Sequence, residues 1–174
     1  VLPAITLIIL LNLLVLFSEV VIKGMKKNIV DITISLFGVC YVVFCLMFAP
    51  LIRDSIEDGR ILIWYVFFIA WGTDIFAYLI GKNFGKHKFT EISPNKSIEG
   101  CVAGILGAVL LSMLYTLVCN LVWNTEISYI YIFGLSIFLS VISQIGDLAA
   151  SSVKRYCQIK DFSNLIPGHG GILD

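Results

Sequence analysis

Long apolar stretches separated by short polar segments make up most of the chain. Each of five stretches is close to 20 residues or longer, the length an α-helix needs to cross the hydrocarbon core of a bilayer. Backbone inside a bilayer must satisfy its own hydrogen bonds, and the alternating polarity of a β-barrel is missing. The pattern therefore predicts an all-α fold, a polytopic bundle of about five transmembrane helices followed by a polar C-terminal segment. The predicted helices lie near residues 4–22, 29–52, 61–81, 98–123 and 127–149.

The composition agrees with a membrane protein. Of the 174 residues, 59% are hydrophobic and 14% are charged, and the mean hydropathy is +0.96, which no soluble domain of this size is expected to show. The first stretch lacks a basic leader and a small-residue cleavage site, which favours a spanning helix over a signal peptide. The chain starts at Val1 in an apolar run and stops at Asp174 in a polar one, so we expect a fragment of a longer protein. With no internal repeat or linker, residues 1–174 predict one integral membrane domain.

The positive charges predict an orientation. Ten of the twelve lysines and arginines lie in the polar segments after the first and third stretches or in the C-terminal segment. The other side holds only Arg53 and Arg60, offset by three acidic residues. The positive-inside rule therefore places the C-terminal segment at the cytoplasmic face. The residues expected to form an aromatic belt at the outer interface are Trp64, Tyr65, Trp123, Tyr129 and Tyr131.

Charge and cysteine content exclude some classes of protein. The formal net charge is zero, and the basic residues lie in loops that are expected to be basic, so nothing indicates nucleic-acid binding. The five cysteines form no metal-type pair, which favours reduced, packed thiols. Small residues recur in the fourth stretch, so a neighbouring helix can approach closely there, and such a face also permits a homodimer. They are Gly100, Ala103, Gly104, Gly107 and Ala108.

Asp74 is the first of three polar features that a passive bundle does not explain. It lies seven residues before Gly81, about 10 Å from the cytoplasmic end of the third helix at 1.5 Å per residue. A carboxylate at that depth costs several kcal/mol, so it should face a partner or a water-filled cavity. A functional role is the default for such a residue, and an ion pair with Lys82 or Lys96 is the structural alternative.

The second feature is Asp147, near the cytoplasmic end of the fifth helix. Ser140, Ser143, Gln144 and Asp147 recur at spacings of three and four residues, so they share one helix face. This polar face lines either a cavity or a hydrogen-bonded contact between helices.

The third feature is the segment Ser93-Pro94-Asn95-Lys96-Ser97. We expect Ser93 to cap a helix that starts at Pro94, with Lys96 and Ser97 in its first turn. A helix N-terminus exposes N–H groups and a positive dipole, so an added lysine would complete an anion site. A plain cap beside an ordinary loop lysine is the alternative.

These groups meet at one face of the predicted bundle. Carboxylates hold Mg²⁺, whereas lysine, arginine and backbone N–H groups hold phosphate. A site with both at the lipid interface suggests phosphoryl or nucleotidyl transfer to a lipid phosphate.

The C-terminal segment carries a more specific pattern. Its ordered Ser, Lys-Arg, Lys-Asp, Pro, His-Gly-Gly and Asp resemble the signature of the phosphatidate cytidylyltransferase (CDP-diacylglycerol synthase) family. The resemblance extends to WGTDIFAYLIGKNFGKHK, SPNKSIEG and GDL, so the range 61–174 carries the matching motifs, while the family pattern continues beyond Asp174. The matching residues are Ser151, Lys154, Arg155, Lys160, Asp161, Pro167, His169, Gly170, Gly171 and Asp174.

The resemblance implies an Mg²⁺-dependent enzyme that joins CTP and phosphatidic acid into CDP-diacylglycerol and pyrophosphate at the cytoplasmic face of a membrane, the inner one in a bacterium. By it, Asp147 and Asp174 hold one metal ion or a pair, and Asp74 is either a further ligand or a group that orients the ligands. Lys154 and Arg155 join them as catalytic residues. Lys96 and Lys160 would bind phosphate, and His169 either donates to phosphate or only shapes its turn. The remaining expected substrate-binding residues are Ser93, Ser97, Ser151, Asp161, Gly170 and Gly171.

Two other functions stay open at this point. A CTP-dependent polyprenol or dolichol kinase would transfer the γ-phosphate of CTP instead of its nucleotidyl group. A cation or proton transporter would use Asp74 and Asp147 as ion ligands, although broken helices and repeated halves, which transporters favour, are missing from the sequence.

Overall fold

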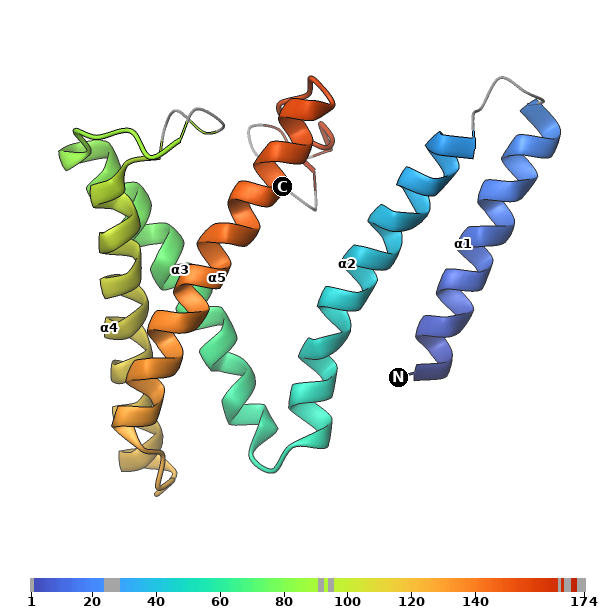
Figure 1. The fold of residues 1–174 in the computed structure, drawn as a ribbon. Helices are drawn as coiled ribbons and strands as arrows, with labels where there is room; N and C mark the ends of the chain where they lie inside the picture. Colours follow the sequence, from blue (N-terminus) through green and yellow to red (C-terminus); the bar gives the residue numbers. More distant parts are fainter. Residues whose placement is uncertain are drawn as a thin grey trace. The chain divides into compact units, whose positions relative to one another are not determined.

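In the computed structural model, the described residues form five α-helices (Figure 1). Lys88 and Ser97 form an isolated β-bridge, and no strand forms in the part of the chain described, so the all-α prediction is confirmed. The residues described are 2–23, 29–90, 93, 96–165, 167 and 170–171. The helices are α1 (Leu2–Lys23), α2 (Ile29–Ser55), α3 (Gly59–Phe84), α4 (Ile98–Val122) and α5 (Tyr129–Tyr156).

Among the described residues, four helices are long and apolar enough to cross a membrane, which makes the chain an integral membrane protein. They are α3, α4, α5 and the Ile32–Ser55 part of α2. The first predicted helix also forms, as α1. Among its described residues, the apolar segment Thr6–Glu19 is too short to cross a membrane.

Two compact units divide the chain, Val1–Ile63 and Trp64–Asp174. In the first unit α1 contacts α2. The second unit contains most of α3, all of α4 and α5, and the C-terminal segment, so it holds nearly all of the range 61–174 in which the motifs were recognised. A single domain in the whole protein stays a prediction.

Helix α4 shows why the second unit suits a lipid environment. Its buried face consists of small and hydroxyl-bearing residues, and the opposite face exposes leucines at intervals of three and four residues. A soluble protein would place these leucines inside, whereas a bilayer is as apolar as leucine and only close packing and hydrogen bonds favour helix contact. The exposed residues are Leu106, Leu110, Leu114, Leu117 and Leu121.

Glycines bring α3 and α4 into backbone contact. A Cβ atom on Gly104 would lie 2.8 Å from the Thr73 carbonyl oxygen, and one on Gly72 would lie 2.9 Å from Ala108 Cα. The close approach predicted from the small residues of the fourth stretch is therefore confirmed. Because α3 of the same chain covers this face, it gives no support to the homodimer, which stays a prediction.

Buried hydroxyl groups join the three helices of the second unit. Thr73 on α3 and Ser140 on α5 lie with their hydroxyl oxygens 2.7 Å apart. Since Thr73 already donates its single hydroxyl hydrogen to the Ile69 carbonyl, Ser140 is the donor in this pair. A second pair, Ser112 and Ser136, links α4 to α5 at 2.6 Å. The polar face predicted on the fifth helix is thus a helix contact at Ser140.

Tyr65 belongs to the same hydrogen-bonded core. Its side chain is 3% exposed, and its hydroxyl lies 2.8 Å from that of Thr116, which already donates to the Ser112 carbonyl. Tyr65 is therefore the donor to Thr116. Its predicted place in an exposed aromatic belt is wrong, because a buried phenol needs a partner and α4 supplies one. The other four belt residues are exposed: Trp64, Trp123, Tyr129 and Tyr131.

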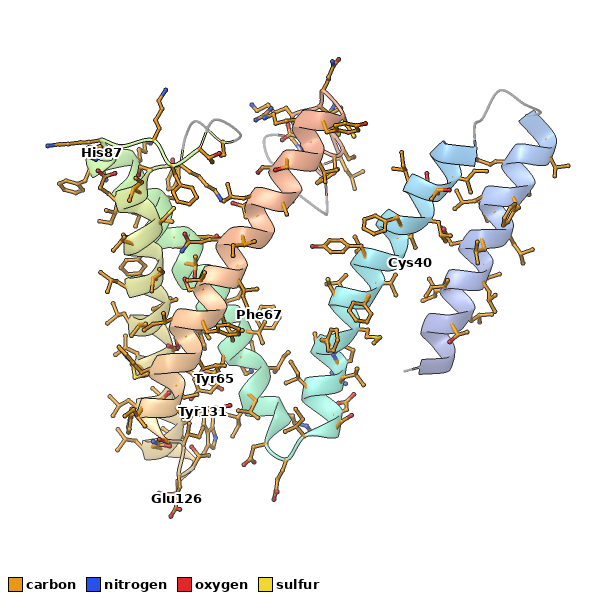
Figure 2. All side chains as sticks on the ribbon, viewed as in Figure 1. Cys40, Tyr65, Phe67, His87, Glu126 and Tyr131 are labelled. Atoms are coloured by element: carbon orange, nitrogen blue, oxygen red, sulfur yellow. The ribbon has the colours of Figure 1, made fainter. Side chains whose placement is uncertain are left out.

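Substituting Tyr65 by phenylalanine is expected to lower the free energy of unfolding by about 1 kcal/mol, because one buried interhelical hydrogen bond is lost. The matched control is Tyr131→Phe, since Tyr131 is 67% exposed (Figure 2). Thermal unfolding in detergent measures both variants. Equal midpoints for the two would show that the Tyr65 hydroxyl contributes nothing.

Helix α5 continues seven residues beyond its predicted end near residue 149 and places Ser151, Lys154 and Arg155 on a helix instead of in an irregular segment. Lys154 and Arg155 lie in its last turn, where positive charge stabilises the helix dipole. The Ile159 N–H then donates to the Lys154 carbonyl at 2.9 Å and the Gln158 N–H to the Arg155 carbonyl at 3.0 Å. With Gln158 at φ 57°, this is a Schellman motif, which closes the helix.

Candidate functional site

Asp74 lies in the second half of α3, directly after the buried residue Thr73. Its neighbour Thr73 is 1% exposed and bonded to Ser140, which fixes this turn of α3. Asp74 itself lines a cavity, together with Ala77 and Tyr78 one turn later. Among the described residues Lys82 donates to the Tyr78 hydroxyl at 3.3 Å and Lys96 pairs elsewhere, so the ion pair considered for Asp74 does not form.

The loop before α4 places Lys96 and Ser97 at this cavity. The Phe89 N–H donates to the Lys96 carbonyl at 2.9 Å and the Ile98 N–H to the His87 carbonyl at 3.0 Å. This pairing holds Ser97 extended, with φ −116° and ψ 155°, so the helix begins only after it. Ser97, whose hydroxyl accepts from the Gly100 N–H at 3.1 Å, is the N-cap. The prediction that Ser93 caps a helix starting at Pro94 is wrong, and Pro94 lies outside the described residues.

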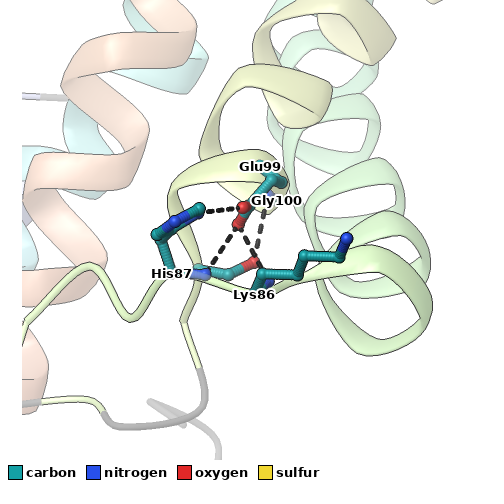
Figure 3. Close-up of polar contacts among 5 residues, drawn as sticks. Lys86, His87, Glu99 and Gly100 are labelled. Atoms are coloured by element: carbon teal, nitrogen blue, oxygen red, sulfur yellow. Dashed lines mark hydrogen bonds and ion pairs between the residues drawn. The ribbon is translucent and has the colours of Figure 1, made fainter.

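Glu99 in the first turn of α4 binds Lys86 and His87 at the start of the same loop (Figure 3). One carboxylate oxygen accepts from the N–H groups of Lys86 and His87 at 3.2 and 3.3 Å, and the other lies 2.6 Å from His87 Nδ1. A carboxylate in the first turn of a helix is also stabilised by the helix dipole. Ser97 thus caps the α4 N-terminus and Glu99 binds Lys86 and His87, while Lys96 is the charged residue among the described loop residues that line the cavity.

On α5, Gln144 and Asp147 complete the cavity. Gln144 Nε2 donates to the Cys101 carbonyl at 3.1 Å and joins α5 to α4. Asp147, three residues further on, forms an ion pair with Lys96. The predicted polar face of this helix is therefore divided, with a helix contact at Ser140 and a cavity wall at Gln144 and Asp147.

Together these elements enclose a cavity of about 340 Å³. Its lining residues come from α3, the loop before α4, the start of α4 and α5. Figure 1 shows that α3 ends, α4 begins and α5 reaches its C-terminus at the same end of this bundle. The charged lining residues of the cavity, among those described, are Asp74, Lys96 and Asp147. The lining residues are Thr73, Asp74, Ala77, Tyr78, Ser93, Lys96, Ser97, Gly100, Cys101, Gln144 and Asp147.

The structure thus brings together five of the predicted site residues from three separate segments: Asp74, Ser93, Lys96, Ser97 and Asp147. The predicted residues of the C-terminal segment do not line this cavity in the part of the chain that is described. Lys154 there lies over the ring of Phe162, with Nζ 5.4 Å from the ring centroid. His169 and Asp174 lie outside the described residues. The others placed outside the cavity are Ser151, Lys154, Arg155, Lys160, Asp161, Gly170 and Gly171.

The donor set of the cavity fits a hard divalent cation. Mg²⁺ in enzymes is usually held by one or two carboxylates together with substrate phosphates, and Asp74 and Asp147 supply two carboxylates in one space. Within the described ranges no group of three or more histidine, cysteine or acidic residues could hold a metal ion. A cation bound by Asp74 and Asp147 would therefore need further ligands, such as substrate phosphates. The residues therefore suit a cation that arrives with phosphate.

Tyr78 and Cys101 line the cavity but were missed from the sequence. Tyr78 follows Asp74 by four residues, a spacing that places both on one helix face and could have identified it. Cys101 gave no such signal. All five cysteines are free thiols, as predicted, but the expected packing is wrong for Cys45 and Cys157, which are exposed, and only Cys119 is buried.

By fold and site, the chain is an integral membrane protein whose helix bundle encloses a charged cavity at one end. It belongs to the Cytidylyltransferase family, whose sequence pattern matches residues 2–174. It is 43% identical over 135 residues to the phosphatidate cytidylyltransferase of Bacillus subtilis strain 168, covering 77% of this chain and 49% of that protein.

Two staphylococcal relatives match a longer part of the chain. The phosphatidate cytidylyltransferase of Staphylococcus aureus strain COL is 38% identical over 164 residues, and that of Staphylococcus haemolyticus strain JCSC1435 is 36% identical over 161 residues. Each match covers 92% of this chain and 59% of the relative. The chain thus spans about half to three-fifths of the length of these relatives.

Proposed function

We propose that the whole protein condenses CTP with phosphatidic acid, giving CDP-diacylglycerol and pyrophosphate for phospholipid synthesis. The observation that carries the proposal is the cavity in which Asp74, Asp147 and Lys96 meet. Membership of the Cytidylyltransferase family and the names of the relatives support nucleotidyl transfer to phosphatidate over a γ-phosphate kinase or a transporter.

In this reaction a phosphate oxygen of phosphatidic acid attacks the α-phosphorus of CTP, and the bond to the bridging oxygen of the β-phosphate breaks. The lipid phosphate is its own nucleophile, so the protein contributes positioning and charge neutralisation. Lys96 binds a phosphate oxygen as a point charge. Asp147 and Asp74 would hold Mg²⁺, which supplies a Lewis acid that neutralises negative charge on the phosphates.

The C-terminal residues extend this site in the proposal. Lys154 and Ser151 follow Asp147 by seven and four residues, so all three share one face of α5. Seven residues of helix span about 10 Å, which suits phosphate groups held beside the cavity. The same substrate-binding segment contains Arg155, Lys160, Asp161, Gly170 and Gly171, with His169 as a hydrogen-bond donor to phosphate and Asp174 as a further metal ligand.

The proposal places this site at the cytoplasmic face. The basic residues of the α3–α4 loop and of the α5 C-terminus lie at the cavity end of the second unit, as the positive-inside rule requires for that side. CTP then enters from water, and phosphatidic acid enters from the inner leaflet.

Labelled CTP tests the proposal. Whole protein in phosphatidic acid vesicles should move label from the α-phosphate of CTP into lipid, release pyrophosphate, and require Mg²⁺. Transfer of γ-phosphate label into lipid would instead identify a kinase. Absence of lipid labelling in folded protein, together with cation flux across the vesicle membrane, would identify a transporter.

A further inference from the structure

The cavity holds an ion pair in the place where the proposed reaction needs a separated cation and anion site. Lys96 contacts one carboxylate oxygen of Asp147, and both side chains remain partly accessible, at 27% and 53% of their surfaces. Asp74 lines the same cavity as the pair. The charged groups among the described lining residues are two carboxylates and one ammonium, which together carry a formal charge of minus one.

Lys96 and a divalent cation compete for the same carboxylate. While Lys96 neutralises Asp147, a cation that approaches meets both a reduced negative charge and a repelling ammonium group. A phosphate group that enters the cavity offers Lys96 a second anionic partner, and an ammonium group on a flexible four-carbon stem can reorient toward it. Movement of Lys96 to phosphate would leave the Asp147 carboxylate available to the cation.

The position of Lys96 suits such an exchange. Its backbone is fixed by hydrogen bonds to Phe89 and Ser93, at 2.9 and 3.0 Å. Its side chain crosses from the α3–α4 loop to α5, whereas Asp147 is anchored on a regular helix turn. Only the lysine side chain has to move, so no rearrangement of the helices is required.

We propose that Lys96 is a latch that couples the two halves of the site: it holds Asp147 when the cavity lacks phosphate and releases this carboxylate to a divalent cation when a lipid or nucleotide phosphate binds. The inference rests on the proposed function. Because coupling between two ligands is reciprocal, phosphate then raises cation affinity and the cation raises phosphate affinity by the same factor. Lys96 is thereby a positioning residue for the cation and a ligand for the phosphate.

Mn²⁺ binding, measured by electron paramagnetic resonance on protein in phosphatidylcholine nanodiscs, tests the latch without turnover. The variant Lys96→Gln should bind Mn²⁺ about tenfold more tightly than the unsubstituted protein, because one competing positive charge is removed. Lys88→Gln is the matched control, since Lys88 is an exposed lysine of the same loop outside the cavity. Its affinity should equal that of the unsubstituted protein. A merely structural role for Lys96 cannot produce a gain in affinity.

Nanodiscs that contain phosphatidic acid supply the second arm, with protein-free nanodiscs subtracted. The lipid phosphate should raise Mn²⁺ affinity several-fold more in the unsubstituted protein than in Lys96→Gln, because in the variant phosphate adds a ligand for the cation but has no ion pair to open. Unchanged or weaker Mn²⁺ binding by Lys96→Gln in phosphatidylcholine would overturn the latch, as would a complete lack of Mn²⁺ binding. If the Mn²⁺ results overturn the latch but the unsubstituted protein transfers label from CTP to lipid, the proposed function stands without the latch. If the unsubstituted protein transfers no label, the proposed function is wrong, whatever the Mn²⁺ affinities are.

Discussion

Substituting Asp147 by asparagine in the whole protein is expected to lower kcat about 10²–10³-fold, the range measured when one preorganised electrostatic group is removed from an active site. Asparagine keeps the shape of the side chain but removes its charge. On the proposed assignment the variant loses a cation ligand, and Lys96 loses the partner that it contacts in the cavity. Mg²⁺-dependent transfer of α-phosphate label from CTP to lipid measures the effect.

Glu126→Gln is the matched control for Asp147→Asn. It also exchanges a carboxylate for its amide, but Glu126 is exposed in the α4–α5 turn, at the end of the bundle opposite His87 (Figure 2). Its turnover should equal that of the unsubstituted protein. Full turnover in a folded Asp147→Asn protein would contradict the assignment of this carboxylate to the cation.

Gly104→Ala is expected to have the largest effect on stability, a decrease in the free energy of unfolding of about 1–3 kcal/mol through overpacking. The added Cβ would lie 2.8 Å from the Thr73 carbonyl oxygen and 3.2 Å from the Ala77 Cβ. Main-chain atoms cannot rotate away, so α3 and α4 must separate. Because Thr73 precedes Asp74, the separation also moves a cavity carboxylate, and thermal unfolding together with Mn²⁺ affinity measures both effects.

Gly134→Ala is the matched control for Gly104→Ala, since Gly134 also lies in a spanning helix. Gly134 on α5 has nothing within 4 Å of the place where a Cβ would lie. Alanine there gains helix propensity worth up to about 1 kcal/mol without a clash, so Gly134→Ala should be neutral or stabilising. Equal destabilisation by the two alanines would show that α3–α4 contact is not what Gly104 provides.

Much of this fold is predictable because bilayer thickness fixes helix length. All five helices were expected, and the bounds of α4 differ from the prediction by one residue. Two intramembrane carboxylates and the loop lysine were also predictable, since a charge at that depth needs a function or a partner. These are the residues that the cavity brings together.

The features that were predicted wrongly depend on contacts between residues that lie apart in the sequence. The bridge between Lys88 and Ser97 joins residues nine positions apart and moves the helix cap from Ser93 to Ser97. Burial of Tyr65 depends on Thr116, a hydroxyl 51 residues away. From the sequence, Asp74 was the carboxylate considered as a partner for Lys96. Lys96 pairs with Asp147 instead, because the loop that carries it crosses to α5.

The most direct test of one shared reaction site is a double-mutant cycle on kcat with Asp74→Asn and Asp147→Asn in the whole protein. Groups that act as a unit are strongly non-additive, so the double variant should be little slower than the slower single variant. Multiplication of the two single effects would mean that the carboxylates act independently, which would contradict a single cavity that joins α3, the α3–α4 loop and α5 into the site of nucleotidyl transfer.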